Sequence, residues 1–324
     1  MRAKRIAITM GDPGGIGPEV IIKAVESGRL TAGCEPVVLG DIDVMREAAK
    51  MCNSKLSIVS VLDISIPAPK GVLKVLDMGP ISFTKGAPSR NAGRIIVESV
   101  RKAVALAQKG DVAGIVTAPA SKESIKKAGF PWPGHTEMLA DFTRTERFAM
   151  MFVSEKLKVI LCTIHIALTD VPHMITKKRV LSTLMHAEKG ALMLGIDAPK
   201  IGVAGLNPHA GEAGIMGKEE LSAIIPAVEA ARQQGMDVHG PYPPDVIFHK
   251  ANNGEFDMVV CMYHDQGLIP FKMIAFDTGV NMTVGLPVIR TSPDHGTAFD
   301  IAWSNKANPS SMIEAVNLAL RLNI

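Results

Sequence analysis

Three histidines, His165, His209 and His264, each follow an apolar run that predicts a buried strand. In open α/β sheets, ligands bind beyond the carboxyl ends of the strands, so side chains this far apart in the sequence can converge on one crevice. Neutral imidazoles bind zinc and related divalent ions, and three protein ligands leave one position open for a substrate. Each histidine could instead be a hydrogen-bonded residue at a strand end, and spacing does not separate the two interpretations.

A metal at such a crevice suits the oxidation of an alcohol, because contact with a Lewis acid lowers the pKa of the hydroxyl and stabilises the alkoxide that expels hydride. Asp265 follows His264, and Asp245 follows two prolines; either carboxylate could orient a ligand or move a proton. Asp245 could equally be a turn or helix-cap residue. We take Asp245 and Lys272 as the candidate catalytic residues.

Two further groups of residues suit the binding of an acidic substrate. His135 and Thr136 follow Pro133-Gly134, where a helix is expected to begin, and exposed amides at a helix N-terminus attract anions. Both could instead cap that helix. The second group lies in three strand-like segments and could cradle a phosphate or carboxylate, or form the solvated face of the strands. It consists of Lys272, Asn281 and Arg290.

The N-terminal segment ITMGDPGGIGPE is rich in glycine and follows a predicted strand. It matches neither GxGxxG nor a GK[ST] phosphate loop, and its two prolines stiffen it. A tight strand-to-helix turn with Pro18 in the first turn of the helix is as well supported as a ligand contact.

Short β-rich runs alternate with helical segments along the chain, which predicts α/β lobes built on parallel sheet with crossover helices. Residues 56–79 are strand-like but carry prolines, which predicts an edge or an insertion. We expect one discontinuous lobe from residues 1–128 plus 275–324 and a second from residues 129–274, with the active site between them.

The composition indicates a globular protein that needs no cross-links. Of 324 residues, 47% are hydrophobic, which is enough for two buried cores. The 35 basic and 32 acidic side chains leave a net charge of +3 without a basic block, so nucleic acid is not expected as a partner. No apolar stretch is long enough to span a membrane, the first apolar run reads as a strand, and we expect a cytoplasmic protein with reduced cysteines.

Five segments in this order resemble the 4-hydroxythreonine-4-phosphate dehydrogenase family. They read ITMGDPGGIGPE, PGHTEMLAD, GLNPHAGEAG, MYHDQGLIPFK and GVNMTVGLPVIRTSPDHGTAFDIA, and they span nearly the whole chain. The resemblance implies a homodimer of two-lobed subunits of the isocitrate and isopropylmalate dehydrogenase-like class, with a cleft between the lobes. It implies that the second lobe contributes much of the metal site and of the dimer interface.

The resemblance also assigns roles to individual residues. His165, His209 and His264 match the ligands of one divalent ion, zinc, magnesium or cobalt, drawn from both subunits. The residues that match the substrate contacts are His135, Thr136, Lys272, Asn281 and Arg290. By analogy with the adenosine loop of related decarboxylating dehydrogenases, His295 and Gly296 lie against adenine, and Asp300 binds a ribose hydroxyl, which favours NAD over NADP.

The family reaction oxidises the C3 alcohol of 4-phosphooxy-L-threonine and decarboxylates the product to 3-amino-2-oxopropyl phosphate for pyridoxal 5'-phosphate synthesis. Thr169, Ser121 and Trp303 depart from the pattern expected of the family. They leave open a related branch that oxidises 4-phospho-D-threonate or 4-phospho-D-erythronate, and a relative that oxidises a cyclic dihydrodiol carboxylate.

Two other classes of function are compatible with this architecture. A phosphate acyltransferase shares the two-lobed fold but needs neither the three histidines nor an adenosine loop, so a metal requirement excludes it. A metal-bound ligand sensor would bind a small phosphorylated acid without NAD and without turnover, and no DNA-binding motif supports it.

Overall fold

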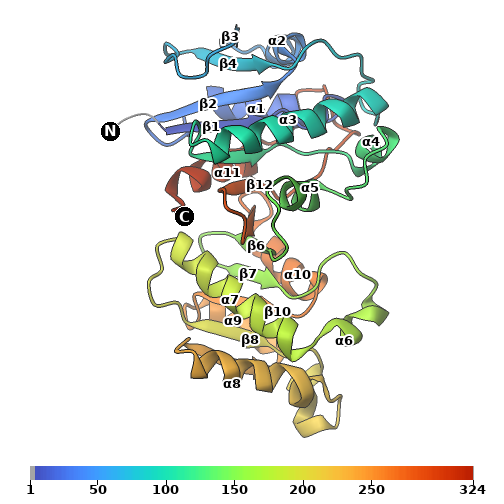
Figure 1. Cartoon of the computed structure of the whole chain (residues 1–324), viewed down its shortest axis with the longest axis vertical. Coiled ribbons are helices and arrows are strands. Elements are labelled where there is room, and N and C mark those ends of the chain that lie inside the picture. The colour runs from blue at the N-terminus through green and yellow to red at the C-terminus, as the bar shows by residue number, and fades with distance from the viewer. Residues whose placement is uncertain (1–3, 324) are drawn as a thin grey trace. The chain divides into compact units, whose positions relative to one another are not determined.

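The chain divides into two compact units in the computed structural model, which describes residues 4–323. The first unit combines Met1–Glu146 with Leu286–Leu322, and the second is the continuous segment Arg147–Gly285. In Figure 1 the first unit therefore takes its colours from both ends of the scale, and the second from the middle. Both units alternate strands and helices, which confirms the predicted α/β class.

A parallel sheet in the order β3-β4-β2-β1-β5-β12 forms the centre of the first unit. Its strands are β1 (Lys4–Thr9), β2 (Cys34–Gly40), β3 (Ser57–Val61), β4 (Val72–Asp77), β5 (Gly114–Thr117) and β12 (Arg290–Pro293). Residues 6–9 of β1 and all four residues of β5 are buried, as expected of central parallel strands that are covered on both faces. The pairing of Arg290 with Ile115 brings the C-terminal segment onto the sheet.

Helices pack against this sheet, and several begin at a side-chain cap. They are α1 (Gly17–Glu26), α2 (Ile42–Met51), α3 (Arg90–Gln108), α4 (Lys122–Lys127), α5 (His135–Phe142) and α11 (Ser310–Arg321). Asp41, Ser89 and Ser121 accept backbone N–H groups at the starts of α2, α3 and α4. The two ends of the unit meet where Nζ of Lys4 donates to the carbonyl of Leu320 at 3.1 Å.

A sheet in the order β11-β6-β7-β10-β8-β9 forms the centre of the second unit. Its strands are β6 (Ala149–Val153), β7 (Lys158–Leu161), β8 (Ile201–Ala204), β9 (Val238–Tyr242), β10 (Met258–Cys261) and β11 (Val280–Val284). Strand β6 is antiparallel to both of its neighbours, whereas β7, β10, β8 and β9 are parallel. The predicted parallel arrangement therefore holds for the whole first sheet and for one side of the second.

The helices of the second unit cover a core that includes Phe152, Val159, Ile247, Val259 and Phe271. They are η1 (Leu168–Asp170), α6 (Val171–Met174), α7 (Lys177–Met193), η2 (Pro208–Gly214), η3 (Glu220–Ile224), α8 (Ile225–Gln233), α9 (Pro244–Asn252) and α10 (His264–Ala275). No helix within residues 4–323 is long and apolar enough to cross a membrane.

The structure corrects two predictions. The segment around Lys272, expected as a strand, belongs to helix α10, because Leu268, Phe271 and Ala275 recur at helical spacing and face the core. The expected boundaries at 128/129 and 274/275 also differ from the division observed. Helix α5 lies in the first unit because it packs against α3, and β11 lies in the second because it pairs with β6.

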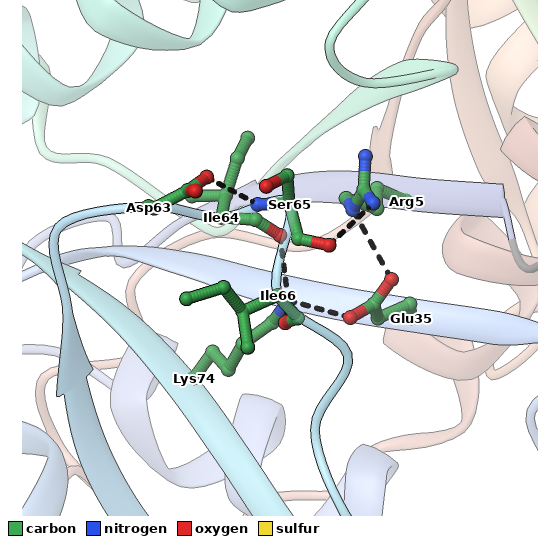
Figure 2. A network of polar contacts seen from close by, with 7 residues as sticks. All are labelled: Arg5, Glu35, Asp63, Ile64, Ser65, Ile66 and Lys74. Carbon is green, nitrogen blue, oxygen red and sulfur yellow. Dashed lines mark hydrogen bonds and ion pairs between the residues drawn. The ribbon is translucent and has the colours of Figure 1, made fainter.

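The edge predicted for residues 56–79 is confirmed, since β3 is the outermost strand and β4 lies next to it. Between these strands, a loop is held by the buried Lys74, which is 2% exposed (Figure 2). Its Nζ donates to Glu35 at 2.5 Å and to the carbonyls of Ile64 and Ile66 at 2.7 and 2.8 Å. Arg5 supplies a second cation, 3.2 Å from Glu35. All the donors of the ammonium group are thus used within the fold.

Candidate functional site

Strands β7, β10 and β8 lie side by side and parallel in the second unit, so their carboxyl ends share one edge of the sheet. His165, His264 and His209 follow these three ends in the chain. The rings of His165 and His264 are 5.7 Å apart between centroids. Nδ1 of His264 lies 2.7 Å from Oδ1 of Asp265, an arrangement that orients the ring and leaves Nε2 as its remaining ligand atom.

His209 lies in η2, whose backbone is left-handed over five successive residues. The φ angles are 53° at His209, 52° at Ala210, 81° at Gly211, 42° at Glu212 and 55° at Ala213. The left-handed conformation costs a non-glycine residue roughly 1–2 kcal/mol. Strain of this kind persists only where the surroundings impose it, and it is concentrated at functional sites.

The three histidines do not form one complete ligand set in this chain. Residues 4–323 contain no group of three or more His, Cys, Asp or Glu side chains placed to hold a metal ion. The structure thus brings His165 and His264 together but does not join His209 to them in a single site.

The other candidates in the second unit lie on three different elements. Lys272 is on α10, with Nζ 5.9 Å from the centre of the Phe276 ring. Asn281 is on β11, and its enclosed Oδ1 atom has no hydrogen-bond partner within residues 4–323. Asp245 is exposed in the first turn of α9, after the N-cap Pro243, where the helix dipole favours a carboxylate. Asp245 is therefore not the cap of that helix.

His135 and Thr136 open helix α5 as the sequence predicts, but neither caps it, because the N-cap is Gly134. The Nε2 atom of His135 is enclosed and has no hydrogen-bond partner within residues 4–323. Burial, and then the nearby charge of Arg290, lower the pKa of His135 from 6.5 to about 3. The imidazole is therefore neutral at physiological pH and meets a ligand as a hydrogen-bonding group without charge.

Arg290, 3% exposed, begins strand β12 and donates from Nη2 to the hydroxyl of Thr117 at 2.7 Å. Burial lowers its pKa to about 10, and Glu137 opposes that shift. The guanidinium thus stays charged at neutral pH. A buried cation beside the neutral His135 fits a carboxylate or phosphate, which accepts charge-assisted hydrogen bonds from arginine.

The loop that carries His295, Gly296 and Asp300 packs on the glycine-rich N-terminal turn within the first unit. The amide of Ile16 donates to the carbonyl of Thr297 at 3.0 Å, and Nε1 of Trp303 donates to the carbonyl of Pro13 at 2.9 Å. A Cβ on Gly15 would lie 2.8 Å from the Thr297 carbonyl oxygen. The glycines of the N-terminal turn therefore allow close approach of the loop, and Pro18 lies in the first turn of α1.

Two buried carboxylates, Asp12 and Glu220, are not among the residues predicted from the sequence. Asp12 accepts the amide of Gly14 at 2.9 Å and the hydroxyl of Ser124 at 2.6 Å, and burial raises its pKa despite these hydrogen bonds. Asp12 follows β1 in the chain, so it carries the same signal as the three histidines, a polar residue after a predicted strand. Glu220 carries no such signal, since nothing in its neighbours marks it as buried.

The residues described fit the groups that a metal-dependent dehydrogenase needs. Two imidazoles, one backed by a carboxylate, and an enclosed amide oxygen are suitable donors for a divalent ion and its substrate. The buried Arg290 and the neutral His135 fit an anionic substrate group. The first set lies in the second unit and the second set in the first unit, so substitutions can test each set separately.

Comparison with known proteins gives a family and a reaction class. The model of the family described as "Pyridoxal phosphate biosynthetic protein PdxA" matches residues 32–319. A 4-hydroxythreonine-4-phosphate dehydrogenase from Desulforapulum autotrophicum is 46% identical over 97% of this chain and 94% of its own length. A D-threonate 4-phosphate dehydrogenase from Pectobacterium atrosepticum is 44% identical over 99% of both chains.

Solved structures agree on the fold. The crystal structure of 4-hydroxythreonine-4-phosphate dehydrogenase from Klebsiella pneumoniae superposes with a TM-score of 0.89 at 43% identity, covering 98% of each chain. A β-decarboxylating dehydrogenase from Thermococcus kodakarensis shares the fold at 16% identity, with a TM-score of 0.51. This match confirms, at the level of fold alone, the predicted likeness to decarboxylating dehydrogenases.

Proposed function

The chain belongs to the PdxA family of pyridoxal phosphate biosynthetic proteins, and from this premise we propose that it oxidises and decarboxylates 4-phosphooxy-L-threonine with NAD. Its family relatives are dehydrogenases, so the chain is an oxidoreductase. The product would be 3-amino-2-oxopropyl phosphate. The observation that carries the proposal is the alignment of three histidines after three adjacent parallel strands, two of them with rings 5.7 Å apart.

One divalent ion, zinc, magnesium or cobalt, is proposed to be held by His165, His209 and His264. When bound, it would polarise the C3 hydroxyl and stabilise negative charge on that oxygen during oxidation and decarboxylation. Asp265 orients His264 through the 2.7 Å contact and so presents Nε2 to the ion. NAD would accept the hydride.

A homodimer that shares the metal site between subunits would account for the lack of a complete three-ligand group within residues 4–323 of one chain. Helix α10, which begins at His264, exposes apolar side chains at Ile269 and Met273, and its C-cap residue Phe276 is exposed as well. Exposed apolar surface of this extent on one helix favours contact with another protein surface. A second copy of the chain is the partner we propose.

The substrate anion is proposed to be bound by Arg290 and His135, together with Thr136, Lys272 and Asn281. Arg290 supplies a permanent charge, and His135 a neutral hydrogen-bonding nitrogen whose Nε2 is enclosed. The enclosed Oδ1 of Asn281 accepts a donor from the substrate, such as a hydroxyl or an ammonium group. Lys272 and Asp245 are the residues proposed to accept and return protons.

NAD is proposed to lie along the loop of His295, Gly296 and Asp300. The hydrogen bonds from Ile16 and Trp303 hold this loop against the N-terminal turn, so it is ordered before any nucleotide binds. The carboxylate of Asp300 is exposed and can accept a ribose hydroxyl while repelling a 2'-phosphate. The protein is proposed to act in the cytoplasm, where NAD and phosphorylated metabolites are available.

One alternative substrate class is favoured by a specific observation. Relatives named D-threonate 4-phosphate dehydrogenase match this chain at 44% identity, close to the values for the relatives named for 4-hydroxythreonine 4-phosphate. The same Arg290 and His135 pair would bind the phosphate or carboxylate of either substrate. Oxidation of 4-phospho-D-threonate or 4-phospho-D-erythronate is therefore the second candidate function.

The deciding experiment measures NADH formation by the purified protein with a divalent metal and each of the three substrates under identical conditions. A clear preference in kcat/KM for 4-phosphooxy-L-threonine supports the main proposal, and a preference for either sugar acid supports the alternative. No NADH formation from any of them, with metal and NAD present, overturns both. A chelator added to the active mixture tests the metal requirement directly.

A further inference from the structure

Glu220 is 1% exposed and begins η3, a short π-helical segment that leads into α8. Its Oε1 accepts the backbone N–H groups of Leu206 and Asn207, each at 2.8 Å, and its Oε2 accepts Nδ2 of Asn207 at 2.8 Å. Both oxygens of one buried carboxylate are thus used by the chain just before His209. Segments with π-helical hydrogen bonding are rare and are frequent at functional sites.

The left-handed segment passes directly over the same carboxylate. A Cβ on Gly211, where φ is +81°, would lie 2.6 Å from Oε2 of Glu220. A Cβ on Gly205 would lie 2.9 Å from Cα of Ala210 and 3.2 Å from Oε1 of Glu220. The chain on either side of His209 therefore has no free space in which to relax toward an ordinary conformation.

The contacts with Glu220 explain how residues 209–213 are kept in the left-handed conformation. Hydrogen bonds from Leu206 and Asn207 fix the residues before the run, and the close contact at Gly211 fixes its middle. All three partners of the carboxylate are neutral N–H groups, so the arrangement depends on direction and distance more than on charge pairing.

We propose that Glu220 is a positioning residue that holds the backbone of His209 in its left-handed conformation and thereby sets the direction of the imidazole. The inference rests on the proposed function, in which His209 is a ligand of the divalent ion. Glu220 touches neither substrate nor metal and acts through the loop. Loss of the Glu220 carboxylate should leave the imidazole of His209 free to move in the metal-free protein. Metal binding should then be weaker, because the ion has to order this side chain when it binds.

The test compares Glu220→Ala and Glu220→Gln with a matched variant, Glu219→Ala. Glu219 contacts the same Asn207 Nδ2 at 2.8 Å but accepts no backbone amide of this loop among the hydrogen bonds described. Cobalt titrated into the metal-free full-length protein, followed by its visible absorption, gives an affinity that does not depend on turnover. Hydrogen exchange of residues 206–213 in the metal-free protein reports the order of the loop without any metal.

We expect Glu220→Ala to bind cobalt about 10- to 100-fold more weakly than the wild type, the range found when partners behind metal ligands are removed. Its loop amides should exchange faster. Glu220→Gln keeps one acceptor oxygen for the two backbone amides and should restore part of the affinity, a graded rescue that a general loss of stability would not give. Glu219→Ala should stay close to the wild type in both measurements.

Wild-type cobalt affinity and wild-type exchange in Glu220→Ala overturn the proposal. If that variant does not fold, the same two results in Glu220→Gln overturn it equally. Cobalt binding distinguishes failure of the proposed function from failure of the role proposed for Glu220. A wild-type protein that binds no cobalt overturns the metal site and the proposed function, whereas a wild type that binds cobalt beside a Glu220→Ala variant of equal affinity overturns only the role of Glu220.

Discussion

Each unit has a buried charged residue that makes three hydrogen bonds and fixes a loop. The two loops differ in their backbone conformation. Lys74 pairs with Glu35 and donates to two carbonyls of the loop between β3 and β4, where residues 62–66 have no positive φ. Glu220 accepts three neutral N–H groups and holds a loop with five successive positive φ angles. The first arrangement stabilises an edge of the fold; the second maintains strain next to a candidate ligand.

We expect a substitution in the His209 loop to lower activity and a substitution at Lys74 to lower stability. Replacing His209 with Ala should reduce metal-dependent NADH formation by more than the roughly 100-fold expected for loss of a partner behind a ligand. The exposed side chain makes few contacts, so the free energy of unfolding of the metal-free protein should barely change. Activity assays and denaturant unfolding measure the two quantities. Undiminished turnover contradicts the assignment of His209 as a ligand.

Replacing Lys74 with Met should show the reverse pattern. Removal of the ammonium group leaves Glu35 with Arg5 alone and two carbonyls without their donor, which should cost about 3–5 kcal/mol of stability. The kcat of the folded fraction should be unchanged, because no candidate site residue contacts this network. Lys127→Met is the matched control, since it removes an exposed ion pair with Glu123 and should cost no more than about 1 kcal/mol.

Two glycines of the second unit separate the cost of a left-handed backbone from the cost of contact with Glu220. Gly211→Ala should destabilise the protein by about 1–2 kcal/mol for its left-handed φ, and by a further 1–3 kcal/mol for overlap with Glu220. Gly195 has the same φ of +81° but no atom within 4 Å of a Cβ, so Gly195→Ala should show only the first cost. Equal unfolding free energies for the two variants would mean that the loop yields, and that Glu220 does not constrain it.

The smallest effect is expected from pH. The pKa of His135 is about 3 in the folded protein and 6.5 when unfolded, so between these values the unfolded state binds more protons and stability falls as the pH falls. The slope for one such group is at most about 1.4 kcal/mol per pH unit. His135→Gln should flatten the decline in unfolding free energy between pH 6.5 and pH 5. If the unfolding free energy of His135→Gln falls with pH as steeply as that of the wild type, groups other than His135 cause the decline.

Patterns of residue type predicted the α/β class and the places of the three histidines after strand ends, but not the features that depend on distant contacts. The strand-end rule placed His165, His209 and His264, because a buried parallel strand is visible as an apolar run. The same patterns misread the segment of Lys272, since short apolar runs are common to buried helices and strands. No local pattern marks Glu220, whose burial results from a loop that crosses it.

The domain boundaries were missed for a similar reason. Helix α5 begins after Pro133-Gly134, as the sequence predicts, but its packing on α3 keeps it in the first unit. Strand β11 stays with the second unit through its pairing with β6, a partner far away in the sequence. Such boundaries depend on which helix or strand a segment packs against. Amino-acid composition does not reveal these long-range contacts.

The discontinuous first unit has a consequence for synthesis on the ribosome. The second unit is one continuous segment, residues 147–285, and can fold as soon as it emerges from the ribosome. In the first unit, β5 must wait for β12, and Lys4 for Leu320, until those later residues are synthesised. Arg290 joins His135 only at that late stage. Chains that are cut short before β12 therefore lack the Arg290 and His135 pair that is proposed to bind the substrate anion.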